Sequence, residues 1–191
     1  MELPEFVFLG YCAKQVVTLQ DREIASVSEC IAKRPPDWVA RWDFNRATCW
    51  DSESGALACV PADSPEPYRL FAYRVLPLLF DASAEARVIG VNELFPSDLP
   101  ALPSGAPPEN YRKLGYDVVE RNIAMGILGF GCSPLSCNNM ADEIPVNRFC
   151  LIGSLDAALA AARVFATGKA EPGPYVIVEV LGREPASNMV V

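Results

Sequence analysis

Short apolar runs that are rich in β-branched or aromatic residues recur along the chain, and turn-forming residues separate them. Runs of this length and composition are typical of buried strands. The pattern predicts strands at residues 6–9, 116–120, 149–152 and 175–181. It also predicts a hairpin in which residues 47–50 and 56–60 flank the turn-forming residues 51–55.

The segment 68–80 fits two different elements. Its apolar positions can form one face of a helix, but its aromatic and β-branched residues and Pro77 fit a strand. We favour a strand that leads through the turn at residues 81–83 into a second strand at 87–91.

Three segments have the composition of helices. Asp21 can cap a helix over residues 21–34, because apolar residues follow at helical spacing and two prolines end the pattern. Ser154 can cap a second helix, which Gly168 would end. The paired prolines at the start of residues 107–114 can open a third helix of one or two turns.

Residues 96–108 contain five prolines and therefore predict an extended linker. We expect a single globular domain over residues 1–191, with possible lobes at 1–95 and 109–191 on either side of this linker. The predicted fold class is α+β, with a mostly antiparallel sheet, about three helices and a C-terminal strand-helix-strand unit.

The charge and the length of the apolar runs exclude some partners. The chain has 24 acidic and 16 basic residues, so its average surface repels nucleic acid. No apolar run is long enough to span a bilayer, and the first residues carry acids where a signal peptide has a basic segment. We therefore expect a soluble cytoplasmic protein.

The side-chain inventory limits the chemistry. The chain contains no histidine, which removes the usual general base at neutral pH and a common metal ligand. Its seven cysteines include no Cys-x-x-Cys pair. We therefore expect free thiols in a reducing compartment, with no metal site and no cofactor.

The turn at residues 131–139 is the best candidate for a binding site. It concentrates small polar side chains beside Pro134, which stiffens the turn. The candidate binding residues are Ser133, Ser136, Asn138 and Asn139. Ser and Asn side chains at such places also bond to their own backbone in structural turns, and that alternative stays open.

Glu179 is the candidate for an enzymatic alternative, because a carboxylate inside an apolar strand is costly unless it faces water, pairs with an Arg or has a function. A Glu late in a strand that follows a helix resembles the catalytic Glu of mono-ADP-ribosyltransferases. Ser133 or Ser136 would replace the central-strand Ser of that family. The resemblance implies NAD as a substrate, although residues 5–9 lack the Arg that the family uses to hold NAD.

These observations favour a binding protein that acts on another protein without chemistry of its own. A small acidic protein that neutralises a basic toxin domain is one concrete form. The alternative is a carboxylate-based enzyme that uses Glu179.

Overall fold

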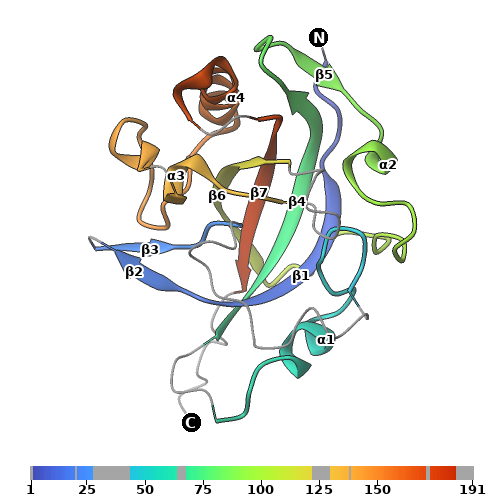
Figure 1. The fold of residues 1–191 in the computed structure, drawn as a ribbon. Helices are drawn as coiled ribbons and strands as arrows, with labels where there is room; N and C mark the ends of the chain where they lie inside the picture. Colours follow the sequence, from blue (N-terminus) through green and yellow to red (C-terminus); the bar gives the residue numbers. More distant parts are fainter. Residues whose placement is uncertain are drawn as a thin grey trace.

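A computed structural model describes residues 2–19, 21–27, 44–63, 68–121, 130–137, 139–170 and 173–183 (Figure 1). Its centre is a five-stranded sheet in which four strands follow the order β1-β4-β7-β6 and β5 pairs with β4. All of these pairings are antiparallel. The strands are β1 (Val7–Gln15), β4 (Tyr68–Phe80), β5 (Ala86–Val88), β6 (Tyr111–Glu120) and β7 (Tyr175–Arg183).

Short elements surround this sheet. β2 (Val17–Leu19) and β3 (Arg22–Ile24) form a separate antiparallel pair. Four α-helices are described, which are α1 (Glu53–Ala58), α2 (Val91–Leu94), α3 (Pro134–Cys137) and α4 (Leu155–Val164). A 3-10 turn, η2 (Met140–Asp142), follows α3, and a π-helical turn, η3 (Phe165–Lys169), follows α4. The expected α+β class with a mostly antiparallel sheet is confirmed.

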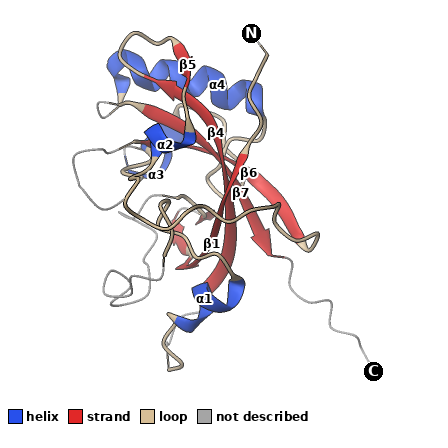
Figure 2. Cartoon of the chain, turned by 90° about the vertical axis from the view of Figure 1, so that its right-hand side faces the viewer, coloured by secondary structure: helices blue, strands red, loops and turns tan. Residues whose placement is uncertain are grey.

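The helices divide between the two faces of the sheet. In Figure 1, α3 and α4 lie to the left of β7 and β4, whereas α1 and α2 lie to their right; Figure 2 shows the same elements from the right-hand side. Along β7, Ile177 packs with the cluster that contains α4, whereas its neighbours Val176 and Val178 pack with the cluster that contains residues of α1 and α2. This alternation is the pleat of a strand that is buried on both faces.

The central strands come from both sides of the proline-rich segment 96–108. β4 precedes this segment and β7 follows it, and the two strands are hydrogen-bonded neighbours. The segment therefore connects parts of one sheet.

Several predicted elements are confirmed. Residues 68–80 form a strand, and the chain turns at Asp81 into β5. This second strand ends at Val88, short of the predicted 87–91, and Val91 begins α2. Ser154 caps α4 by accepting a hydrogen bond from the backbone N–H of Ala157, and Gly168 adopts a left-handed φ of 94° near the end of η3. Residues 175–181 lie in β7.

The helix predicted from Asp21 is wrong in the described part of its range. Asp21 has a φ of 64° in the turn between β2 and β3, so it cannot cap a helix there. The backbone N–H groups of Glu23 and Ala25 donate to the carbonyl oxygens of Arg148 and Phe149, at 2.8 and 3.2 Å. These distant acceptors hold the segment extended; residues 28–34 lie outside the described residues.

Three further predictions are wrong, because the residues concerned form a different local structure from the one that their sequence pattern suggested. Residues 53–58 form α1, where the hairpin turn at 51–55 and a second strand at 56–60 were predicted, since the Ser52 hydroxyl accepts a hydrogen bond from the N–H of Gly55. Residues 111–114 belong to β6 in place of a helix, and Gly115 lies at an irregularity in the β6–β7 register. In residues 149–152 the only ladder contact is an isolated bridge between Ile152 and Tyr116.

The strand predicted at residues 6–9 is also longer than expected. It continues through Gly10, where the pairing with β4 shifts register.

Among the described helices, none is both long and apolar enough to cross a membrane.

Candidate functional site

A fully buried carboxylate, Asp117 of β6, organises the region that contains the predicted binding residues. Its Oδ1 accepts a hydrogen bond from the Ser133 hydroxyl at 2.5 Å. Its Oδ2 accepts two more, from the Ser26 hydroxyl at 2.9 Å and from the Val27 N–H at 2.8 Å. Burial raises the pKa of Asp117, although these hydrogen bonds and the charge of Lys14 act in the opposite direction.

Ser136 extends this network toward the surface. Its hydroxyl donates to Ser26 Oγ at 3.1 Å, and Ser26 in turn donates to Asp117. A chain of two hydroxyl groups therefore links α3 to the buried carboxylate. Ser133 and Ser136 are both buried. Neither hydroxyl is exposed, because the buried Asp117 receives hydrogen bonds from this turn, directly from Ser133 and through Ser26 from Ser136.

A cavity of about 270 Å³ lies on the outer side of Ser136. Its polar lining comes from β3, α3, η2 and the residues beside them: Arg22, Ser136, Asn139, Asp142 and Cys150. Its apolar lining is Ile24, Leu135 and Ala141. The cavity therefore joins β3 to residues 135–150, a part of the chain more than a hundred residues later.

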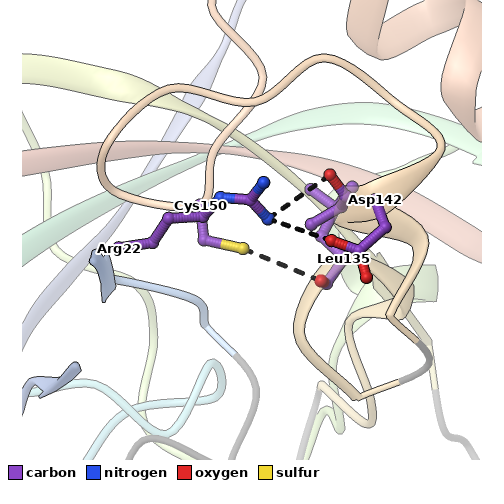
Figure 3. Close-up of polar contacts among 5 residues, drawn as sticks. Arg22, Leu135, Asp142 and Cys150 are labelled. Atoms are coloured by element: carbon purple, nitrogen blue, oxygen red, sulfur yellow. Dashed lines mark hydrogen bonds and ion pairs between the residues drawn. The ribbon is translucent and has the colours of Figure 1, made fainter. Parts of the chain in front are cut away.

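An ion pair stands at this cavity. Arg22 Nη1 lies 3.4 Å from Asp142 Oδ1 and also donates to the carbonyl oxygen of Ala141 at 3.4 Å. Figure 3 shows the Arg22 guanidinium reaching toward Asp142 from β3. The two side chains are 34% and 60% exposed, so solvent reaches both charges.

Cys150 forms part of the cavity wall and is not poised as a nucleophile. Its thiol donates to the carbonyl oxygen of Leu135 at 3.7 Å (Figure 3). Burial raises the pKa of Cys150 to about 11, and the charge of Asp117 adds to this effect. The thiol is therefore protonated at neutral pH.

Some of the predicted binding residues therefore lie close together in the structure. Ser133 and Ser136 lie in the buried network, and Ser136 and Asn139 line the cavity. Asn139 is exposed, has a left-handed φ of 58°, and its carboxamide makes no hydrogen bond within the described residues. Asn138 lies outside the described residues.

Glu179 lies apart from this cluster. It is paired across strands with Tyr116 and Arg74, whereas Asp117 is the next residue of β6 and points to the opposite face of the sheet. Arg74 Nη1 donates to Glu179 Oε2 at 2.9 Å. The structure therefore does not bring Glu179 together with Ser133, and an Arg on the neighbouring strand accounts for its charge.

The sequence analysis missed the residues that organise the site. Asp117 carries the same signal as Glu179, a carboxylate inside an apolar strand, and that signal could have found it. Arg22 and Asp142 have no such signal, because they are 120 positions apart in the sequence and only the fold brings them together.

The described cysteines belong to no metal-binding cluster. Within the part of the chain that the structure describes, no group of three or more His, Cys, Asp or Glu residues could hold a metal ion. Six cysteines are described, and all are thiols rather than disulfides. Two of them are close to each other, since Cys12 Sγ lies 3.3 Å from Cys49 Sγ.

Comparisons of the chain with protein-family models, with curated proteins and with solved structures find no match.

Proposed function

We propose that this chain is a soluble cytosolic binding protein that acts by contact with another protein. A basic protein is the partner that its charge favours, because acidic residues exceed basic ones by 24 to 16. Neutralisation of a basic toxin domain is the concrete form of this function. No cofactor is part of the proposal.

The observation that carries the proposal is the surface at the cavity beside Asn139. Asn139 and Asp142 are exposed there and offer a carboxamide and a carboxylate, while the buried network behind Ser136 fixes the backbone that presents them. A preformed polar surface loses little conformational entropy on binding. Ser133 and Ser136 then shape the surface, and Asn139, together with Asn138 on sequence grounds, makes the contacts.

The test is affinity capture from the native host with the full chain as bait, followed by mass spectrometry and by titration of the captured protein. The test variant combines Asn138→Ala with Asn139→Gly, because glycine keeps the left-handed φ of Asn139. Asn110→Ala is the matched control, since Asn110 is exposed in the turn before β6. We expect the wild type and the control to bind one basic protein, with an affinity that falls as salt is raised. Equal binding by the test variant would contradict the proposed surface.

The second candidate is an NAD-dependent enzyme that uses Glu179. It is favoured by one observation: the guanidinium beside this carboxylate is 36% exposed, so a solvent-accessible cation stands next to the acid. Thermal unfolding with and without NAD separates the two functions. The binding proposal expects no shift of the unfolding midpoint, whereas a rise that is lost in Glu179→Gln would support the enzyme.

A further inference from the structure

Arg22 and Asp142 form a weak ion pair at the cavity. The distance between Arg22 Nη1 and Asp142 Oδ1 is 3.4 Å, and both side chains reach solvent. An exposed pair of this kind contributes little to stability, because solvent screens both charges. A ligand that offers a partner to each charge can therefore open the pair at little cost.

The uncharged lining adds further groups at fixed positions. The Ser136 hydroxyl lines the cavity and is held in place by the Ser26 hydroxyl at 3.1 Å and the Ser133 carbonyl oxygen at 3.4 Å. The Asn139 carboxamide offers both a donor and an acceptor. Ile24, Leu135 and Ala141 form an apolar wall next to these polar groups.

We propose that this cavity binds a small zwitterion, a free α-amino acid with an aliphatic side chain. The carboxylate of the ligand pairs with Arg22, and its ammonium group pairs with Asp142. The aliphatic side chain packs against the wall formed by Ile24 and Leu135. This site goes beyond the proposed protein–protein contact and does not depend on it.

Other small ligands fit the charges less well. A simple anion satisfies Arg22 but repels Asp142, and a simple cation does the reverse, because the two charged groups are close together. A zwitterion gives each of them a partner. The volume of about 270 Å³ is below the usual range for drug-sized ligands, which favours a ligand of amino-acid size.

Isothermal titration calorimetry of the full chain tests the site. The probes are glycine, L-alanine and L-leucine, with N-acetyl-L-leucine and L-leucinamide as analogues that lack one charge each. We expect affinity to rise from glycine to L-leucine, because the longer side chain buries more apolar surface. Both analogues should bind about tenfold more weakly than L-leucine, since each loses a charged contact. Absence of heat with all three amino acids, or equal binding of either analogue, would overturn the proposal.

Variants of the two charged residues place the ligand in this cavity. Arg22→Gln and Asp142→Asn should each weaken L-leucine binding about tenfold. Arg87→Gln is the matched control, because Arg87 Nε forms a similarly long surface pair of 3.6 Å with Asp81. L-Leucine binding that survives in both cavity variants, or that falls as much in the control, would show that the ligand lies elsewhere. If Arg22→Gln fails to fold, Asp142→Asn alone decides, since the Asp142 side chain is 60% exposed.

Discussion

Lys14 and Asp117 stand on the two outer strands of the β1-β4-β7-β6 order and bind the same backbone unit, that of Val27. Lys14 Nζ donates to the Val27 carbonyl oxygen at 2.6 Å, and the Val27 N–H donates to Asp117 Oδ2 at 2.8 Å. Both charged side chains are almost completely buried. The backbone of Val27 therefore links β1 to β6 through a buried polar side chain on each strand.

Loss of Asp117 should destabilise the protein strongly. Asp117→Ala leaves the Val27 N–H and the Ser26 and Ser133 hydroxyls without their acceptor, and it removes the negative charge near Lys14. We expect the free energy of unfolding to fall by about 3–5 kcal/mol in urea titrations. The control Asp142→Ala should change it by less than about 1 kcal/mol, because that carboxylate is exposed. Similar costs for the two variants would contradict the role of the network.

The same carboxylate should make stability depend on pH. Because burial raises the pKa of Asp117 above its unfolded value, the folded state binds this proton more tightly than the unfolded state. Its contribution to the free energy of unfolding therefore decreases as pH rises from about 4, the unfolded pKa, through the higher folded pKa. Asp117→Asn removes this titration. The free energy of unfolding of the wild type minus that of Asp117→Asn should fall with rising pH. A rise of this difference would show that folding lowers the pKa of Asp117.

The two kinds of predicted binding residue should respond differently to substitution. Ser133→Ala removes a buried donor from Asp117 and should cost about 1–3 kcal/mol. Asn139→Gly should change the free energy of unfolding by about 0.5 kcal/mol or less, because Asn139 is exposed and glycine accepts its backbone conformation. Chemical unfolding of the two variants measures both values. Equal small changes would show that the hydrogen bond from Ser133 to Asp117 contributes little to stability.

Local signals predicted the elements whose tertiary contacts agree with them. The capping hydroxyl of Ser154 and the apolar run at residues 175–181 lead to α4 and β7, which pack where their own patterns direct them. Asp21 shows the opposite case. The helix signal after it is overridden, because Glu23 and Ala25 bond to carbonyl groups more than a hundred residues away. No local pattern contains that information.

The candidate site was predictable to a similar extent. The polar composition of residues 131–139 identified the turn, and Ser136 and Asn139 do line a cavity. The sequence could not predict the buried partner of this turn, since Ser133 is equally compatible with a surface hydroxyl and with a donor to a buried acid. Only the pairing of β6 with the sheet brings Asp117 to that hydroxyl.

Cys12 and Cys49 should form a disulfide under mild oxidation. Their sulfur atoms are 3.3 Å apart, and an S–S bond of about 2.05 Å needs only a small further approach. With glutathione disulfide as oxidant, the two thiols lose two hydrogens and two molecules of glutathione are released. We expect non-reducing peptide mapping to recover the 12–49 pair, slowly, because both thiols are buried.

Substitutions identify the pair. Cys12→Ser or Cys49→Ser should abolish this disulfide, whereas Cys59→Ser should not, because the buried Cys59 thiol bonds to the Gly55 carbonyl oxygen. In a further test, the protein is unfolded, refolded and then oxidised for a long time. If Cys12 and Cys49 can still be alkylated as two free thiols, the expected pairing is contradicted.

Among Gly10, Gly105 and Gly153, replacement of Gly10 by alanine should destabilise the protein most. The three differ in whether φ is positive and in whether a Cβ atom would meet a close neighbour. Gly10 has a φ of 117°, and a Cβ there would lie 2.6 Å from the Trp50 carbonyl oxygen, which accepts the Tyr11 N–H. Gly10→Ala combines backbone strain with a clash and should lower the free energy of unfolding by about 2 kcal/mol or more. Gly105→Ala has a similar φ of 112° without any close neighbour, so strain alone should cost about 1 kcal/mol. Gly153→Ala has neither feature and should be nearly neutral. Urea unfolding of the three variants gives the order, and an equal cost for Gly10→Ala and Gly105→Ala would show that β1 can move away from Trp50.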